Sequence, residues 1–231
     1  MLELFPEGFE ERDVAGGLEL VAYTDPSGEE RLWAAFGPVT SERVAAGWEA
    51  RWRQFHRPVR IGPLWVGAPW ERPDRGLAVT IDPGRAFGTG AHPTTRLCLE
   101  LLLEPEPTSL LDVGCGSGVL AVAAAKLGFE PVVAIDHDRA AVKATRRNAA
   151  ANDVRLDVRR GDALSDELPP ASVIVANVTG QLIRQLAGRI DSDVLIASGY
   201  LESDRPDVPG FVRGQRRVLE GWAADLFRRE E

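Results

Sequence analysis

The chain has 231 residues, 44% of them hydrophobic, and its formal net charge at pH 7 is −8. This length allows one large domain with a small appendage, and no run of about 18 apolar residues indicates a transmembrane helix. Binding to phosphate backbones needs a basic face, so the acidic balance argues against a direct nucleic-acid partner, while it suits a basic protein substrate.

The N-terminal part of the chain, residues 1–47, is interpreted as a small recognition region. It begins without a basic segment or a long apolar core, so it does not resemble a signal peptide, and we expect a cytoplasmic protein. Residues 18–24 and 31–36 flank a turn signal and predict a β-hairpin. From residue 40 to residue 55, apolar residues at every third or fourth position predict a helix.

The next part, residues 48–75, is predicted to be a connector. Four prolines separate its apolar residues, which favours an extended segment packed against the protein. We therefore divide the chain into a recognition region (1–47), a connector (48–75) and a larger domain (76–231).

The larger domain alternates strand and helix patterns. Strands are expected at 77–81, 110–113, 131–135, 154–160, 172–176 and 193–198, and helices at 95–103, 119–126, 138–151 and 179–190. Asp138 is expected to cap the third of these helices, and Asn152 to end it in the left-handed conformation. Residues 211–219 and 222–228 predict a terminal hairpin. Repeated βα units indicate an α/β fold, a doubly wound, mostly parallel, seven-stranded Rossmann-like sheet with a C-terminal β-hairpin.

A glycine loop follows the second of these strands. Residues 108–118 read Thr-Ser-Leu-Leu-Asp-Val-Gly-Cys-Gly-Ser-Gly, which is the order strand, loop, helix N-terminus, and Gly114 and Gly116 let the backbone approach a ligand. Asp136 ends the next strand and suits the two hydroxyls of a ribose. The spacing G-x-G-x-G differs from the G-x-G-x-x-G of dinucleotide sites and resembles motif I of class I S-adenosylmethionine (SAM) methyltransferases. A structural turn without ligand and an NAD site are the alternatives.

Two further polar residues follow strands of the same sheet. Asp162 could accept a hydrogen bond from an adenine amino group, or it could be a turn or cap residue. Asn177 stands where a methyl acceptor would bind, or it simply ends its strand. No aromatic ring follows Asn177, so a nucleobase or a glutamine amide is a poor candidate acceptor. The two cysteines, Cys98 and Cys115, cannot form a zinc site by themselves, and no bound metal is expected.

A long glycine- and threonine-rich segment precedes the glycine loop. It reads Asp-Pro-Gly-Arg-Ala-Phe-Gly-Thr-Gly-Ala-His-Pro-Thr-Thr over residues 82–95 and has the composition of a pliable lid. Together with the motifs above, it resembles the PrmA family, the SAM-dependent methyltransferases that modify large-subunit ribosomal protein L-eleven. The resemblance covers roughly residues 48–200.

This resemblance implies a set of site residues. It implies that Thr95, Gly114, Asp136 and Asn177 hold SAM and the product S-adenosylhomocysteine. Besides these four, we expect Gly116, Asp162 and the loop residues Phe87, Gly88 and Thr89 to contact the cofactor. The resemblance makes His92 a constituent of the loop rather than a general base. The resemblance also implies a ferredoxin-like recognition domain that is joined to the catalytic domain. Only a hairpin and one helix are predicted here before the connector, so we expect a shortened recognition region, which weakens the substrate assignment.

The function predicted from these patterns is SAM-dependent methylation of amino groups, lysine ε-amine or α-amine, of a protein, with a ribosomal protein preferred. A lysine must be neutral to attack, which costs roughly 4–5 kcal/mol at pH 7 unless burial lowers its pKa. Asn177 would orient the amine, with no dedicated general base. A different protein or small-molecule amine as acceptor, and a non-catalytic SAM-binding module, are the alternatives. We expect a monomer that does not contact membranes.

Overall fold

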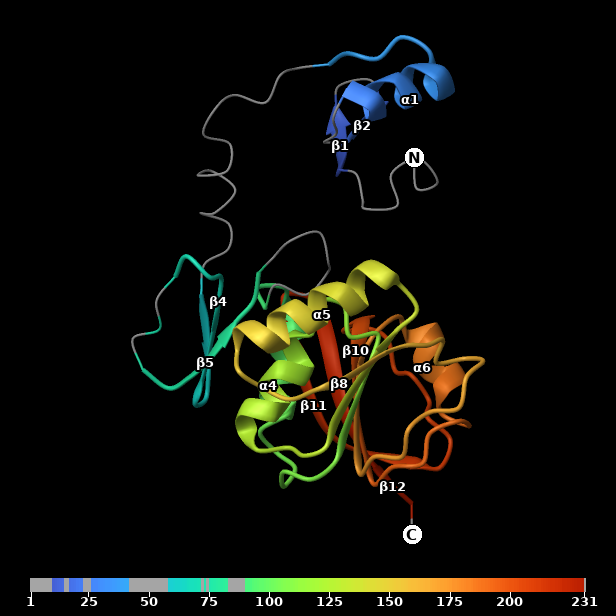
Figure 1. Cartoon of the computed structure of the whole chain (residues 1–231). Coiled ribbons are helices and arrows are strands. Elements are labelled where there is room, and N and C mark those ends of the chain that lie inside the picture. The colour runs from blue at the N-terminus through green and yellow to red at the C-terminus, as the bar shows by residue number, and fades with distance from the viewer. Residues whose placement is uncertain are drawn as a thin grey trace. The chain divides into compact units, whose positions relative to one another are not determined.

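The chain separates into two units in the computed structural model, Met1–Trp52 and Arg53–Glu231 (Figure 1). The structure describes residues 10–14, 17–22, 26–41, 58–71, 73, 75–82 and 90–230. Within these ranges, no helix combines the length and the apolar composition needed to cross a membrane. The division into a recognition region, a connector and a catalytic domain stays a prediction.

The N-terminal unit contains a hairpin and a helix. Strands β1 (Glu10–Val14) and β2 (Gly17–Val21) pair antiparallel, and α1 (Pro26–Phe36) follows. The predicted pairing of residues 18–24 with 31–36 is therefore wrong, because residues 31–36 are helical. Residues 29–36 contain no β-branched residue and several good helix formers, and proline suits the first position of a helix. Most of the helix predicted over 40–55 lies outside the described residues.

A seven-stranded sheet forms the centre of the larger unit, in the order β11-β12-β10-β9-β6-β7-β8. Its strands are β6 (Leu110–Val113), β7 (Val132–Asp136), β8 (Asp157–Arg160), β9 (Val173–Asn177), β10 (Val194–Leu201), β11 (Phe211–Leu219) and β12 (Trp222–Arg229). The strands from β10 to β8 run parallel, whereas β12 and β11 add an antiparallel hairpin. Glu220 and Gly221 have φ angles of 52° and 79°, as a tight hairpin turn requires. The predicted fold class is confirmed.

Helices cover both faces of this sheet (Figure 1). They are α3 (Pro93–Leu101), α4 (Val119–Leu127), α5 (Arg139–Ala151) and α6 (Gly180–Leu186). Alternate residues of a strand point to opposite faces. Accordingly, Leu110 packs in a core with residues of α3, α4 and α5, whereas Leu111 packs in a second core with α6. The sheet is thus buried on both sides, as its apolar strands predict.

A smaller three-stranded sheet lies in the same unit. Strand β3 (Val59–Ile61) pairs antiparallel with β4 (Leu64–Gly67), which pairs parallel with β5 (Leu77–Thr80). The proline-rich segment predicted as a connector therefore supplies two strands, and its residues Leu64 and Val66 are buried in the core with α3 and α4.

The end of α5 corrects a detail of the sequence interpretation. Asn152 has a φ angle of −102°, not the left-handed value expected, and the neighbouring Asp153 takes the left-handed φ of 54° instead. The amide of Asn152 makes two hydrogen bonds to the backbone of Thr80, one accepted from its N–H at 2.7 Å and one donated to its carbonyl at 2.6 Å. Asn152 thus ends α5 as expected, but in another conformation, and it also bridges α5 and β5.

A buried carboxylate holds the C-terminal hairpin to the sheet. Asp225 on β12 is fully buried, and the hydroxyl of Tyr200 donates a hydrogen bond to it at 2.9 Å. Arg216 and Arg213 of β11 form ion pairs with the two oxygens of Asp225, at 2.8 Å and 3.0 Å. This network joins β10, β11 and β12.

Replacing Asp225 with alanine leaves Arg216 and Tyr200 without their buried partner. We expect Asp225→Ala to lower the free energy of unfolding by about 3 kcal/mol. Arg217→Ala is the control, because it removes an exposed ion pair of the same hairpin with Glu104, and it should cost less than about 1 kcal/mol. Urea denaturation measures both, and equal losses would show that the buried network adds nothing.

Candidate active site

The order of the strands in the sheet reverses between β6 and β9. From β6 the chain continues outward through β7 and β8, and it then returns to β9 and β10 on the other side of β6. Open α/β sheets bind ligands at such a switch point. The predicted residues that follow β6 and end β9, the glycine loop and Asn177, lie at this point.

The glycine loop needs its glycines for two physical reasons. Gly114 and Gly118 have φ angles of 73° and 83°, a region that other residues avoid. A Cβ at Gly114 would lie 2.9 Å from a methyl group of Val178, and one at Gly118 would lie 2.7 Å from a methyl group of Thr145. The loop is therefore packed tightly against the end of β9 and against α5.

Asp136 is tied directly to the glycine loop. One carboxylate oxygen accepts a hydrogen bond from the N–H of Gly116 at 3.0 Å, and the other accepts from the N–H of Asp138 at 2.9 Å. Its relative exposure is 9%. Each carboxylate oxygen can accept a further hydrogen bond. Asp136 is thus oriented by the backbone and retains acceptor capacity for the hydroxyls of a ribose.

Asp112 is a second carboxylate at the loop, and it was not among the predicted site residues. One oxygen accepts from the N–H of Ala121 at 3.1 Å, while the other is buried and has no partner among the described residues. Burial, reinforced by the charge of Asp136, outweighs the hydrogen bond from Ala121 and raises the pKa of Asp112 to about 7. A buried acceptor without a donor fits a ligand or a water that brings an N–H or O–H group.

The side chain of Asn177 is oriented by two threonines. Its Nδ2 donates to the hydroxyl of Thr94 at 3.1 Å and to that of Thr95 at 3.4 Å. Both threonines are buried, with exposures of 1%. Because Nδ2 is engaged on α3, the carbonyl oxygen Oδ1 is the remaining acceptor of this amide. The structure therefore brings Thr95 and Asn177 together, while their contact with the cofactor stays a prediction.

His92 acts as the N-cap of α3. Its Nδ1 accepts from the N–H of Thr94 at 3.3 Å and lies 2.8 Å from the Thr94 hydroxyl. The ring packs edge-on against Trp222, with centroids 5.2 Å apart. Burial lowers the pKa of His92 below its ordinary value, and the charge of Glu220 offsets this only in part. A neutral imidazole whose Nδ1 caps a helix has a structural role, in agreement with the interpretation of His92 as a loop constituent.

The other predicted site residues are either exposed or outside the described residues. Asp162 is exposed, and its carboxylate accepts from the N–H of Leu164 at 2.9 Å, so it is a turn residue. A contact between Asp162 and adenine stays a prediction. Phe87, Gly88 and Thr89 lie outside the described residues. In the described part of the chain, no three His, Cys, Asp or Glu side chains form a group that could hold a metal ion.

A buried polar stripe on α5 connects these loops, and the sequence analysis missed it. The amide of Asn148 donates to the carbonyl of Ser117 at 2.8 Å and accepts from the N–H of Asp82 at 3.1 Å. It thus links the glycine loop to the first residue of the 82–95 segment. Thr145 donates to the carbonyl of Gly116 at 3.1 Å. The sequence could have indicated this stripe, because Thr145, Asn148 and Asn152 recur at helical spacing on one face.

Comparison with known proteins gives matches over most of the chain. A family model described as "Ribosomal protein L11 methyltransferase (PrmA)" matches residues 24–220. The ribosomal protein L11 methyltransferase of Thermoanaerobacter pseudethanolicus is 36% identical over 213 residues, which are 84% of this chain and 69% of that protein. The protein of the same name from Vibrio campbellii is 41% identical over 184 residues, 74% of this chain and 62% of that protein. The chain thus spans about two thirds of the length of these curated relatives.

A solved structure matches the same region. The crystal structure of a ribosomal protein L11 methylase from Lactobacillus delbrueckii subsp. bulgaricus superposes with a TM-score of 0.66 and 28% sequence identity. The match covers 76% of this chain and 100% of that chain.

Removing Asn148 tests the link between the two loops. We expect Asn148→Ala to weaken SAM binding about tenfold, because each lost hydrogen bond is worth roughly 1 kcal/mol. Asn152→Ala is the matched control, since it removes a buried amide one turn away that bonds β5 instead of the glycine loop. Titration calorimetry gives the affinities, and an equal loss in both variants would contradict the proposed link.

The lowered pKa of His92 makes stability depend on pH. The folded state binds fewer protons than the unfolded state below about pH 6.5, so the stability due to neutral His92 is complete above that pH and is lost as the pH falls toward the folded pKa. Asn is a good N-cap that does not titrate. As the pH falls from about 8 to 5, we expect wild type to lose more stability than His92→Asn does. A stability difference between the two proteins that does not change with pH would refute this role of His92.

Proposed function

The chain belongs to the PrmA family of ribosomal protein L11 methyltransferases, and we propose on that premise that it transfers methyl groups from SAM to amino groups of a ribosomal protein. The observation that carries this proposal is the hydrogen bond from the N–H of Gly116 to Asp136 at 3.0 Å. This hydrogen bond joins the G-x-G-x-G loop to Asp136, the carboxylate that suits a ribose, at the switch point of the sheet.

The residues near the switch point fit SAM as the cofactor. We propose that Gly114 and Gly116 face it through their backbone, that Asp136 accepts from its ribose hydroxyls, and that Thr95 and Asn177 hold its other end. We further propose that Asp162 contacts the adenine and that Phe87, Gly88 and Thr89 of the 82–95 segment contact the cofactor. The buried oxygen of Asp112, which has no donor in the described part of the chain, suits a ligand or an ordered water with an N–H or O–H group.

The protein's contribution to the reaction is alignment and exclusion of water. SAM, when bound, supplies a methyl group on a positively charged sulfur. Asn177 Oδ1 accepts a hydrogen bond from the acceptor amine, and the threonines of α3 keep that oxygen in place. The amine loses its proton more easily as the site excludes water and brings it near a positive charge. No general base is needed, and His92 is used as a helix cap.

The surroundings of Asn177 favour an aliphatic amine as the acceptor. Val178 follows it, and this side chain packs against the position of Gly114. The N–H of Val178 donates a hydrogen bond to the carbonyl of Ser198 at 2.9 Å. An aliphatic side chain at this place offers no ring on which a planar nucleobase could stack. We therefore propose lysine ε-amines or an α-amine, rather than a base nitrogen.

Labelled methyl transfer tests the proposal. Purified protein is incubated with methyl-labelled SAM and with three acceptors, namely free ribosomal proteins, intact ribosomes and a cell extract without ribosomes. We expect one labelled ribosomal protein, and Asn177→Ala should lower the rate roughly 100-fold through misplacement of the acceptor. Label confined to a non-ribosomal protein or a small amine would favour the second acceptor class.

Direct titration separates the remaining alternatives. SAM should bind and NAD should not, and Asp136→Asn should weaken SAM at least about tenfold, because a hydrogen bond to a charged group is worth roughly 1.5–3 kcal/mol. Asp157→Asn, on the exposed edge strand β8, is the control and should bind as wild type does. Tight binding of SAM with no labelled acceptor would identify a binding module, and binding of NAD alone would overturn the proposal.

A further inference from the structure

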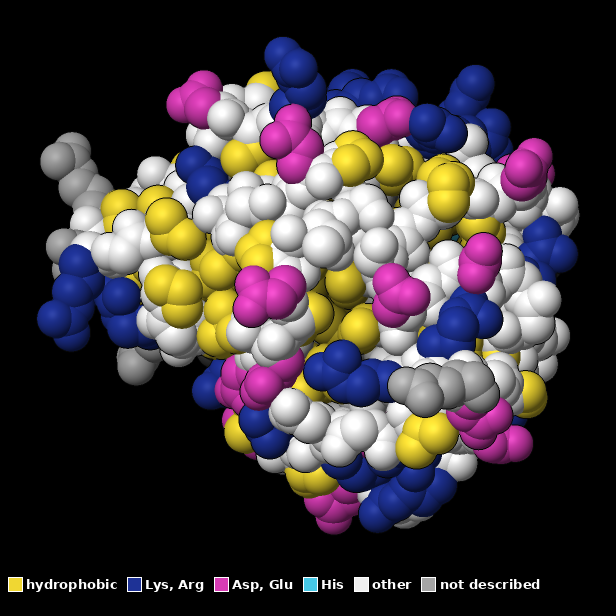
Figure 2. All heavy atoms as spheres, turned by 90° about the horizontal axis from the view of Figure 1, so that it is seen from below, with side chains coloured by type: hydrophobic (Ala, Val, Ile, Leu, Met, Phe, Trp, Pro, Cys, Tyr) yellow, Lys and Arg dark blue, Asp and Glu magenta, His cyan; other side chains and the backbone are white. Residues whose placement is uncertain are grey.

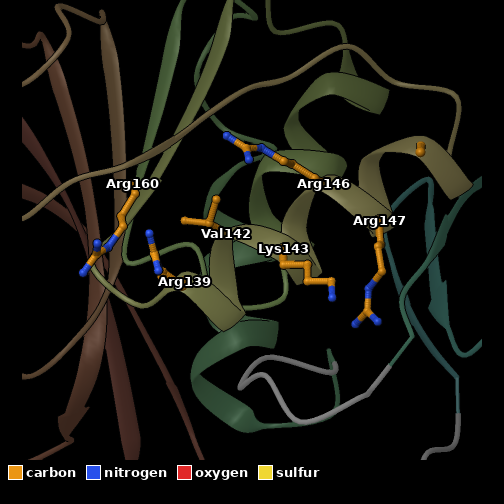
Figure 3. A pocket seen from close by; sticks show the side chains of 7 residues that line it. Arg139, Val142, Lys143, Arg146, Arg147 and Arg160 are labelled. Atoms are coloured by element: carbon orange, nitrogen blue, oxygen red, sulfur yellow. The ribbon is translucent and has the colours of Figure 1, made fainter.

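Among the described residues, five basic side chains and two small apolar ones line a groove on the larger unit. It has a volume of about 650 Å³, and every ionisable residue that lines it is a cation (Figure 3). These residues are Arg139, Lys143, Arg146, Arg147 and Arg160. The first four project from α5, and the fifth ends β8. The chain as a whole is acidic, so this local excess of positive charge needs an explanation.

The positions of these cations are electrostatically unfavourable within the protein. Arg139, Lys143 and Arg147 follow one another at i, i+4 spacing, and like-charge pairs at this spacing destabilise a helix. Arg139 also stands at the N-terminus of α5, where the helix dipole disfavours a positive charge. The helix contains no acidic residue that could compensate. An anionic ligand would relieve all of these repulsions together.

Two of the arginines are held in place by the backbone. Arg146 donates to the carbonyl of Val158 at 2.6 Å, and Arg160 donates through Nε to the carbonyl of His137 at 3.0 Å. A carbonyl neutralises no charge, so both guanidinium groups remain cationic and fixed at the edge of the groove. In the described part of the chain, Arg139, Lys143 and Arg147 form no ion pair.

The net negative charge of the protein does not cancel this field. Charges further away than about 10 Å are largely screened at 0.1 M salt, so the nearby side chains dominate. On the face shown in Figure 2, acidic and basic side chains are interspersed, unlike the lining of the groove. Asp138, which caps α5 by accepting from the N–H of Ala140 at 2.9 Å, keeps its negative charge, but it is one carboxylate beside a lining with five cations.

We propose that this groove binds the phosphate backbone of RNA without reading its sequence. The cations recur once per helical turn, about 6 Å apart along α5, which suits a polymer with regularly spaced negative charges. Guanidinium groups pair with phosphate oxygens through two parallel hydrogen bonds. The other described residues of the lining, Val142 and Ala150, are small and apolar, and neither offers an aromatic ring on which a base could stack.

The groove begins beside the candidate active site. Arg160 contacts His137, the residue that follows Asp136. RNA in the groove would therefore lie beside the end of β7, on the side of the proposed site where Asp136 is proposed to accept from the ribose. This consequence rests on the proposed function, whereas the binding of RNA does not. It revises the expectation, drawn from net charge, of no direct nucleic-acid partner.

The test measures binding of the full chain to two short fluorescent RNAs of unrelated sequence by anisotropy, over a range of salt concentrations. The variant Arg139→Gln/Lys143→Gln/Arg147→Gln removes the unpaired cations and leaves the two fixed arginines. We expect similar affinities for both RNAs. The triple variant should bind on the order of 10- to 100-fold more weakly at 0.1 M salt, and the slope of log K against log salt should become shallower by about 2.

A matched control separates the groove from general charge. Arg184→Gln/Arg217→Gln/Arg228→Gln removes three cations from α6, β11 and β12, none of which lines the groove. It should bind RNA within about twofold of wild type. Urea denaturation and SAM titration verify that both variants are folded. The single charge reversal Lys143→Glu repeats the test should the triple variant prove unstable.

Three results would overturn the proposal. Wild type without salt-dependent binding of either RNA would exclude it, and so would equal weakening by the two triple variants. Competition by polyglutamate as strong as by RNA of equal charge would assign the groove to an acidic polypeptide instead. Failure of methyl transfer would leave these readouts unaffected, so this proposal and the proposed function fail separately.

Discussion

The carboxylate of Asp136 is the constraint on which the arrangement of the site depends. It receives the N–H of Gly116 from one side and that of Asp138 from the other, so it fixes the glycine loop against the tip of β7. The loop in turn packs against Val178 at the end of β9. Three strand tips are thereby held in one geometry, at the point where the order of the sheet reverses. A ligand that lies across them meets groups that are already oriented.

Helix α5 has two polar faces with different roles. The buried face carries Thr145, Asn148 and Asn152, whose side chains bond to backbone groups of the glycine loop and of the segment that follows β5. Buried polar groups of this kind are costly without partners, and here the partners are found. The exposed face carries the basic groove. One helix therefore supports the cofactor loops from within and presents positive charge outside, which connects the candidate site to the proposed RNA surface.

Burial controls the electrostatics of the site. It raises the pKa of Asp112 to about 7 and lowers that of His92, so each group is pushed toward its neutral form. A site of this kind suits a reaction in which a neutral amine must attack and water must be kept away. The amide of Asn177 fits the same requirement, because in the proposed mechanism its neutral oxygen orients the acceptor nitrogen. The proposed mechanism therefore relies on position and desolvation instead of a dedicated base.

Local features of the sequence were enough to predict much of the fold. Repeated strand and helix patterns, the spacing of the loop glycines, Asp136 and the Glu220-Gly221 turn each depend on neighbouring residues, and each was found where expected. Residues 31–36 and the conformation of Asn152 were misassigned, since their local signals are weak or are overridden by distant contacts. Asn148 meets Asp82 across 66 residues of sequence, and Asn177 meets Thr94 across 83. Only the folded chain decides such pairs, because no periodicity specifies which buried polar groups will face one another.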